Sequence, residues 1–314
     1  MFSSREDLCL ITGTANRPLA ERIARYVGRS LTETTIARFA DGEIYAHIQE
    51  NIRGVDAFII QSTPAPADNL MELLILIDAC KRASAQRVTA VIPYLGYARQ
   101  DRKDKPRVAI TAKLVANLIT SAGADRGLTM DLHTPQIQGF FDIPLDHLFA
   151  APVLLDYVER LKLQRPVVVA PDVGSVKMAR AFAKRLSAEL AVVDKRRSSP
   201  NVSETMTLIG EVDGRDVIIV DDLIDTAGTL ANAASLCMAR GARSVRAAAT
   251  HGLLSGQARQ RLDDSPLEIV AITNTLDRDG AELPARIEIL DVAPLLGEAI
   301  RRIHNAESVS SLFV

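Results

Sequence analysis

The residues best suited to chemistry stand in one string, from Val217 to Thr229. An apolar run ends in Asp221 and Asp222, and a short turn of small residues then leads into a helical pattern. Such a turn presents backbone N–H groups at a helix N-terminus, where an anion is favoured. The hydroxyl groups of Thr226 and Thr229 add donors for the same phosphate. The two acids would repel a phosphate, so vicinal hydroxyl groups of a sugar, or a metal ion, suit them instead.

Polar residues follow other apolar runs in the same way, at Tyr94–Arg102, Asp131–His133, Asp172 and Asp194–Arg197. Ligands bind at the carboxyl ends of parallel strands, so we expect these segments to help build the site. Each has an ordinary structural explanation when taken alone. Paired acids solvate strand ends, a threonine caps a helix, and three adjacent cations such as Lys195–Arg197 form a solvated turn. The polar stretch from Arg196 to Ser203 is predicted to be a loop.

Short apolar runs alternate with helical stretches along the chain and predict an α/β fold with parallel sheets covered on both faces. The predicted strands are Leu8–Thr12, Asp56–Ser62, Arg87–Pro93, Leu128–Asp131, Val167–Pro171, Leu190–Asp194, Val217–Asp221, Val245–Thr250 and Glu268–Thr273. The predicted helices include Asn69–Ala83, Thr111–Ala122, Ser175–Ser187 and Thr229–Arg240. Gly241 stands where a C-terminal cap is expected.

The length of 314 residues predicts about two domains. A boundary near residues 148–155 divides the chain into halves of similar size and pattern, so we assign residues 1–149 and 150–314. No linker-like segment marks the boundary, and the halves are expected to touch extensively. The last stretch, of about 20 residues, is a candidate to return to the first domain.

Composition excludes several classes of protein. The net charge is −2, 4% of residues are aromatic and tryptophan is absent, which disfavours a nucleic-acid-binding surface. The three cysteines, Cys9, Cys80 and Cys237, have no metal-ligand spacing and indicate buried, reduced thiols. No signal pattern begins the sequence and no apolar run is long enough to cross a membrane, so a cytoplasmic location is expected.

Further strings occur in a fixed order: Phe39–Glu43, Arg99–Arg102, Asp131–His133, Pro135–Asp142, Asp194–Arg197 and Ser308–Ser310. With the Asp221–Thr229 string, which is similar to the ribose-5-phosphate loop of type I phosphoribosyltransferases, they resemble the class I, bacterial-type ribose-phosphate pyrophosphokinase (PRPP synthetase) family. The resemblance covers essentially the whole chain. It implies two phosphoribosyltransferase-like domains, the first for nucleotide binding and oligomerisation, the second for ribose 5-phosphate.

The resemblance also implies a reaction. The anomeric hydroxyl of ribose 5-phosphate attacks the β-phosphorus of Mg-ATP, and AMP and phosphoribosyl diphosphate (PRPP) are formed for nucleotide biosynthesis. Such transfer depends on positioning and charge neutralisation. Lys195 and Arg197 are then the catalytic cations, on a loop that closes over the triphosphate.

The remaining site residues are carried over in the same way. ATP binding is assigned to Phe39, Asp41, Gly42, Glu43, Arg99 and Gln100. Ribose 5-phosphate binding is assigned to Arg197, Asp221, Asp222, Asp225, Thr226, Ala227, Gly228 and Thr229. His133 and Asp172 are assigned to Mg²⁺, with about two ions expected in each site.

The family's adenine pocket is completed by a neighbouring subunit, which implies a homo-oligomer, expected as a hexamer. Phosphate activation and ADP inhibition are implied at an interface site with Arg53, Arg82, Ser84, Ser308 and Ser310. The sequence also departs from the family pattern at several positions. These departures are Ser175 in place of a second glycine, Met178 in place of an arginine, Gly252 in place of a proline, Asn51 in place of a serine, and the atypical loop Lys103–Ala109.

Two alternatives remain open. A PRPP-consuming phosphoribosyltransferase would share the Asp221–Thr229 string, but would have no need for Phe39–Glu43 or for a second sheet domain. A catalytically inactive regulatory homologue would characteristically interrupt the catalytic or sugar loop, and both loops are intact here.

Overall fold

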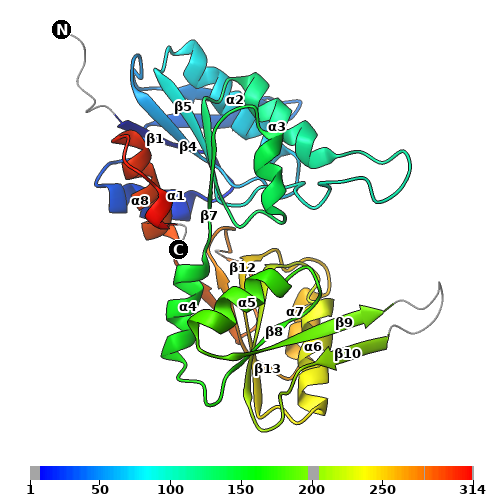
Figure 1. The fold of residues 1–314 in the computed structure, drawn as a ribbon. Coiled ribbons are helices and arrows are strands. Elements are labelled where there is room, and N and C mark those ends of the chain that lie inside the picture. Colours follow the sequence, from blue (N-terminus) through cyan, green and yellow to red (C-terminus); the bar gives the residue numbers. More distant parts are fainter. Residues whose placement is uncertain (1–7, 197–204, 279, 313–314) are drawn as a thin grey trace. The chain divides into compact units, whose positions relative to one another are not determined.

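The computed structural model describes residues 8–196, 205–278 and 280–312. Contacts within the chain divide it into two compact units (Figure 1). Unit 1 comprises residues 1–149, 275–277 and 292–314, and unit 2 comprises residues 150–274 and 278–291. Within the described ranges, no helix has both the length and the hydrophobicity that crossing a membrane requires.

Unit 1 is built on a five-stranded, wholly parallel sheet with the order β1-β4-β5-β6-β7. Its strands are β1 (Leu8–Thr12), β4 (Asp56–Ile60), β5 (Arg87–Ile92), β6 (Arg126–Met130) and β7 (Leu145–Leu148). All five residues of β4 are buried, because helices cover both faces of the sheet. This explains why the strand sequence is apolar throughout rather than alternating.

The helices of unit 1 are α1 (Arg17–Val27), α2 (Asp68–Arg82), α3 (Thr111–Ala122) and α8 (Ala293–His304), with 3₁₀ turns η1 (Pro135–Phe140) and η2 (Ser310–Leu312). Apolar residues of α2 and α3 share one core with the sheet. The C-terminal helix α8 belongs to this unit although most of unit 2 precedes it in the sequence. Asp56 on β4 anchors α8, because it pairs with Arg87 and lies 2.9 Å from Nδ1 of His304.

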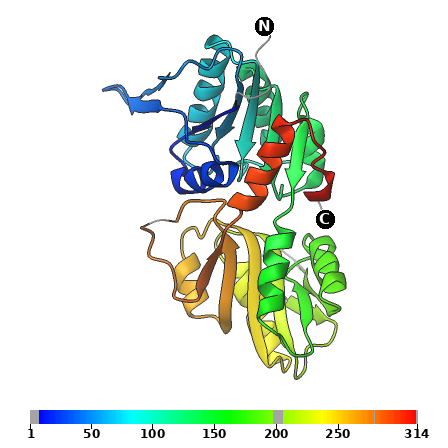
Figure 2. The same ribbon diagram turned by 90° about the vertical axis from the view of Figure 1, so that its left-hand side faces the viewer.

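A hairpin of two antiparallel strands, β2 (Thr34–Arg38) and β3 (Ile44–Ile48), forms a separate small sheet in unit 1. Its blue ribbon projects from the body of the unit (Figure 2). These two strands were not among those predicted from the sequence. They are half-exposed and have no long apolar run, so the hydrophobic pattern carries little signal for them.

Unit 2 contains a seven-stranded sheet with the order β10-β9-β8-β11-β12-β13-β14. The strands are β8 (Val167–Ala170), β9 (Glu189–Arg196), β10 (Thr205–Ile209), β11 (Asp216–Ile224), β12 (Ser244–Gly252), β13 (Leu267–Thr273) and β14 (Ile287–Leu290). All neighbouring pairs are parallel except β9 and β10 at one edge. The carboxyl ends of β8, β9, β11 and β12 therefore meet at one side of the sheet.

The helices of unit 2 are α4 (Ala151–Arg160), α5 (Val176–Arg185), α6 (Gly228–Ala239) and α7 (Ala258–Asp263). Buried residues of α6 and α7 share a core with one face of the sheet. Gly241 follows α6 with a φ of 85°, the left-handed conformation that glycine adopts without strain, and its N–H donates to the carbonyl of Met238. The two sheets with their helices confirm the predicted α/β class.

Several predicted boundaries were wrong, and pairing explains why. The strand predicted to end at Asp221 continues to Ile224, because Leu223 and Ile224 still pair with β12. The strand predicted to end at Asp194 continues to Arg196, because it pairs with β10. The first residue of the predicted loop from Arg196 to Ser203 therefore belongs to β9, and the other residues of that loop lie outside the described ranges.

Candidate active site

A tight turn in unit 2 joins the end of β11 to the start of α6. The turn comprises residues 225–227, and its last residue, Ala227, has the left-handed φ of 60°. No side chain caps the first N–H groups of α6. Uncapped N–H groups at a helix N-terminus are donors for an anion, and the helix dipole favours the same charge. The turn can therefore hold a phosphate group.

Asp221 and Asp222 lie within β11, which continues through Leu223 and Ile224 to this turn. Asp221 was predicted to end the strand, and Asp222 was predicted to follow it. Burial raises the pKa of Asp221 well above its ordinary value, and the negative charge of Asp222 adds to the effect. The charge of Asp172, which follows β8, raises the pKa further. The carboxylates thus lie close enough to repel one another, and a cation or a hydroxyl donor would relieve that repulsion.

One serine connects these carboxylates. The Oγ of Ser175 lies 2.7 Å from Oδ1 of Asp221 and 3.2 Å from Oδ1 of Asp172. The backbone N–H of Ser175 also donates to Oδ1 of Asp172, at 3.1 Å. The sequence marked Ser175 only as a departure from the family pattern, whereas the structure places it between two predicted site residues.

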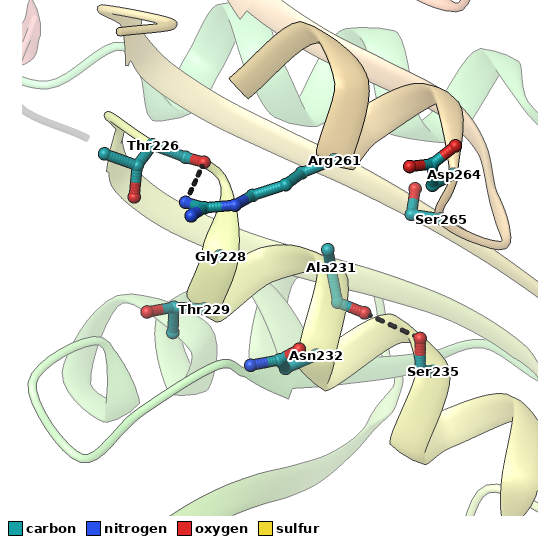
Figure 3. A pocket seen from close by; sticks show the side chains of 9 residues that line it. All are labelled: Thr226, Gly228, Thr229, Ala231, Asn232, Ser235, Arg261, Asp264 and Ser265. Atoms are coloured by element: carbon teal, nitrogen blue, oxygen red, sulfur yellow. Dashed lines mark hydrogen bonds between the residues drawn. The ribbon is translucent and has the colours of Figure 1, made fainter. Parts of the chain in front are cut away.

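A hollow of about 490 Å³ opens beside the turn, between α6 and α7 (Figure 3). Its lining residues are Thr226, Gly228, Thr229, Ala231, Asn232, Ser235, Arg261, Asp264 and Ser265. Nη1 of Arg261 donates to the backbone carbonyl of Thr226 at 2.9 Å, so a positively charged side chain stabilises the turn. Sequence reasoning missed Arg261, because an arginine on a short surface helix carries no signal of its own.

Of the two predicted catalytic cations, Lys195 belongs to the same sheet. The backbone of Lys195 belongs to β9 and pairs with Met206 of β10. Arg197 lies outside the described residues. Lys195 is therefore at the carboxyl end of β9, two strands from β11 in the sheet order.

In unit 1, His133 and the Arg99–Arg102 segment follow neighbouring strands. The hydroxyl of Thr134, next to His133, donates to Oδ2 of Asp101 at 2.8 Å. The backbone carbonyl of Gln100 accepts from the N–H of Ala112, at the start of α3. These contacts bring the segments after β5 and β6 together, as the parallel sheet predicts.

A histidine that sequence reasoning missed holds the backbone beside His133. The N–H of Leu132 donates to Nε2 of the buried His147, at 2.9 Å. Nδ1 of the same ring lies 3.2 Å from Nε2 of Gln138. Asp131 has a φ of 37°, which is unusual for a residue with a side chain. His147 therefore stabilises a sharp turn that positions His133.

The turn of the β2–β3 hairpin carries the other predicted nucleotide residues. Phe39 is 56% exposed and stacks edge-on against Tyr45, with ring centroids 5.6 Å apart. Asp41 accepts a hydrogen bond from the N–H of Glu43, and Gly42 has a φ of 94°.

The predicted metal ligands are divided between the units, because His133 belongs to unit 1 and Asp172 to unit 2. Among the described residues, no three His, Cys, Asp or Glu side chains are grouped so that they could hold a metal ion. A divalent cation would therefore need oxygen ligands from substrate or water as well.

The predicted effector residues form two groups in unit 1. Arg53 lies next to Gly54, whose N–H donates to the carbonyl of Ser84. Arg82 is on the last turn of α2 and pairs with Asp78. The hydroxyls of Ser308 and Ser310 are 3.1 Å apart. Across the described ranges, no hydrogen bond or ion pair connects the serine pair with the first group.

Two other departures from the family pattern lie on regular elements. Gly252 ends β12, and its carbonyl accepts a hydrogen bond from Arg278. A Cβ at this position would come within 2.5 Å of Ile272, so the local arrangement favours glycine. Met178 lies on α5, and nothing in the structure explains it.

Two α/β units, each with a mainly parallel sheet between helices and polar residues at the carboxyl ends, define a protein with phosphoribosyltransferase-like domains. The chain matches the model of the N-terminal domain of ribose phosphate pyrophosphokinase over residues 8–123, and that of the phosphoribosyl synthetase-associated domain over residues 196–314. The chain belongs to the ribose-phosphate pyrophosphokinase family.

Full-length relatives agree with this assignment. The chain is 57% identical to the ribose-phosphate pyrophosphokinase of Chlorobaculum tepidum over 97% of this chain and 94% of that protein. It is 55% identical to that of Clostridium tetani over 100% and 99% of the two chains. The crystal structure of phosphoribosylpyrophosphate synthetase from Mycobacterium smegmatis is similar, with a TM-score of 0.91, 43% identity and coverage of 96% of this chain and 100% of that chain.

Proposed function

We propose that this chain is a ribose-phosphate diphosphokinase. It transfers the β,γ-diphosphoryl group of Mg-ATP to the C1 hydroxyl of ribose 5-phosphate and forms AMP and PRPP for nucleotide biosynthesis. The observation that carries the proposal is the turn of residues 225–227 in unit 2, where a helix whose N-cap residue makes no side-chain hydrogen bond follows a strand with two acids near its carboxyl end. Identity above 50% to full-length pyrophosphokinases supports the same activity.

The sugar phosphate binds at the carboxyl end of β11. Its 5-phosphate accepts hydrogen bonds from the N–H groups of the turn and the hydroxyls of Thr226 and Thr229. Asp221 and Asp222 accept hydrogen bonds from the ribose hydroxyls, which orients the C1 hydroxyl for attack. Asp225 and the small residues Ala227 and Gly228 shape the turn so that the phosphate can approach the backbone.

Positive charge is supplied from β9. Lys195 and Arg197 neutralise the charge that develops on the moving diphosphate. The loop that follows Lys195, which we expect to approach the triphosphate and to withdraw when product leaves, lies outside the described residues and stays a prediction.

The oxygen-rich carboxylates of Asp172 and Asp221 suit Mg²⁺, which prefers oxygen ligands and retains water. His133 and Asp172 would hold Mg²⁺ on the nucleotide side and the ribose side, with about two ions in each site. Bound Mg²⁺ supplies charge neutralisation between the two anionic substrates. His147 keeps His133 in place through the N–H of Leu132.

ATP is assigned to the exposed hairpin turn, Phe39–Glu43, and to Arg99 and Gln100. The turn projects from unit 1 and Phe39 is exposed, so a second copy of the chain can complete the adenine pocket. Helix α3 and its N-cap residue also expose Ile110, Leu114 and Leu118, spaced four residues apart. Both features support a homo-oligomer, with a hexamer as the expected form. Light scattering measures its mass.

Regulation is part of the same proposal. Phosphate and ADP act at an interface site that includes Arg53, Arg82, Ser84, Ser308 and Ser310. The exposed guanidinium of Arg82 and the hydroxyls of the C-terminal serines suit phosphate groups. Titration of the activity with inorganic phosphate, and separately with ADP, tests this assignment.

The decisive assay supplies ATP, Mg²⁺ and ribose 5-phosphate without any nucleobase. The proposal expects equal amounts of AMP and PRPP, which chromatography resolves. Release of diphosphate only when a nucleobase and PRPP are supplied would indicate a phosphoribosyltransferase. Absence of both reactions, together with binding to an active synthetase, would indicate a regulatory homologue.

A further inference from the structure

The hydroxyl of Ser175 lies between carboxylates that come from two adjacent parallel strands. Asp172 follows β8 and Asp221 lies on β11, and these strands pair directly. Ser175 itself is only 8% exposed and immediately precedes α5. Its position is therefore set by its contacts with both carboxylates and by the helix that begins at the next residue.

The contacts around Ser175 give each carboxylate a different donor. A hydroxyl group has one proton, so it donates to one acceptor at a time. The shorter distance, 2.7 Å, assigns that proton to Asp221. Asp172 accepts from the backbone N–H of Ser175 at 3.1 Å and lies within 3.2 Å of the same Oγ. One residue thus sets the orientation of both carboxylates.

We infer that Ser175 is a positioning residue, whose hydroxyl holds the carboxylates of Asp172 and Asp221 in the single arrangement that binds a sugar phosphate together with a divalent cation. The inference rests on the proposed function for the identity of the sugar phosphate. Without the hydroxyl, the partly buried Asp221 keeps, among the described residues, only the N–H of Asp222 as a donor, at 3.0 Å, and turns away from the charges of Asp172 and Asp222. A sugar hydroxyl then meets carboxylates that must first be reoriented.

The same strand provides a matched control. At the other end of β11, Oγ of the buried Ser244 donates to Oδ1 of Asp216, also at 2.7 Å. Ser175→Ala and Ser244→Ala therefore each remove a serine–aspartate hydrogen bond of 2.7 Å, together with one longer contact of the same hydroxyl. Only the first of these bonds lies at the carboxyl end of the sheet, where the site is.

The experiment measures binding of ribose 5-phosphate by calorimetry with Mg²⁺ present, and KM for both substrates. Ser175→Ala is expected to raise the dissociation constant and KM for ribose 5-phosphate about tenfold, the usual effect of losing a hydrogen bond to a charged group. KM for ATP is expected to change less than about twofold. Ser175→Thr, which keeps the hydroxyl, is expected to restore binding, and Ser244→Ala to bind normally.

Thermal unfolding of all variants separates positioning from stability. If Ser175→Ala lowers the melting temperature as Ser244→Ala does but binds ribose 5-phosphate normally, Ser175 is only structural and the inference is overturned. Equal weakening of ribose 5-phosphate and ATP binding would overturn it too. If the wild-type chain binds ribose 5-phosphate without forming AMP, the proposed function fails, while the calorimetric comparison still decides the role of Ser175.

Discussion

Nη1 of Arg261 donates a hydrogen bond to the backbone carbonyl of Thr226, 2.9 Å away, across the hollow beside the predicted phosphate turn. The contact ties α7 to the turn between β11 and α6 and places a positive charge beside it. We expect Arg261→Ala to raise KM for ribose 5-phosphate about five- to tenfold, because a charge-assisted hydrogen bond and local positive charge are lost together. Steady-state kinetics with saturating ATP measures the change.

Arg259 is the control for this prediction, because it lies on the same short helix and pairs instead with Glu282, at 2.5 Å. Its side chain and that of Glu282 are both largely exposed, so the pair contributes little. Arg259→Ala should leave KM for ribose 5-phosphate unchanged. An equal change in both variants would mean that α7 as a whole, rather than the contact with Thr226, affects the site.

Lys195→Ala is expected to lower kcat by about three orders of magnitude or more, while KM for both substrates stays within a few-fold of wild type. The reason is that a cation acting on the developing charge of the diphosphate contributes mainly in the transition state. Lys184→Ala, on the exposed last turn of α5, is the control for loss of a lysine near the same sheet. Turnover close to wild type in Lys195→Ala would remove Lys195 from the catalytic role.

The stability of the chain at acid pH is expected to depend on Asp216. Burial alone would raise its pKa, but hydrogen bonds from Arg243, the N–H of Gln164 and Ser244 outweigh it and lower the pKa from 3.8 to about 2. A carboxyl group whose pKa is lowered by folding stabilises the fold at any pH above its pKa in the unfolded chain. This stability is lost as the pH falls from about 4 through about 2. The contribution is about 2 kcal/mol.

Urea unfolding between pH 5 and pH 2 tests this expectation. At each pH it gives the free energy of unfolding of the wild type and of Asp216→Asn, and the two values are compared. The difference should be largest near pH 5 and shrink by about 2 kcal/mol on acidification. Glu159→Gln, an exposed change on α4, should show a constant difference. A difference between wild type and Asp216→Asn that does not vary with pH would contradict the assignment.

The three cysteine thiols are expected to react slowly with a thiol reagent at pH 8 in the native protein. Burial raises the pKa of each to about 12, so only about one thiol in ten thousand is ionised. Cys9 is partly exposed, whereas Cys80 and Cys237 are buried. Cys9 should therefore react first, and Cys9→Ser should remove that phase. Rapid labelling of Cys237 in folded protein would show that unit 2 opens readily.

The α/β class was predictable because burial on both faces makes a parallel strand apolar throughout. β1 (Leu8–Thr12) and α3 (Thr111–Ala122) were predicted to the residue. β2, β3, β7, β10 and β14 were missed, because they are short or partly exposed and their formation depends on a neighbouring strand. The lengths of β9 and β11 were underestimated for the same reason, since pairing carries Lys195 and Asp222 into strands.

The candidate site, like the fold, was predictable from the sequence only in part. Residue types and their order were enough to indicate a phosphate turn at residues 225–229, because small residues before a helix let an anion approach the backbone N–H groups at the helix N-terminus. The roles of the individual side chains, Lys195 and His133 among them, remain predictions. Ser175, His147 and Arg261 could not be found from sequence, because each acts on a residue that folding alone brings within reach: Asp221 is 46 positions from Ser175, Leu132 is 15 from His147 and Thr226 is 35 from Arg261.

The amino-acid sequence by itself determined the class of fold and the family, and it predicted which residues carry phosphate and metal chemistry, because these depend on local patterns of apolar, small and charged residues. Only the tertiary structure decided that α8 joins unit 1, that Asp221 is partly buried among like charges, and that the Ser175 hydroxyl lies between two carboxylates. Those features arise when distant segments exclude water together, and a linear pattern does not record which segments will meet.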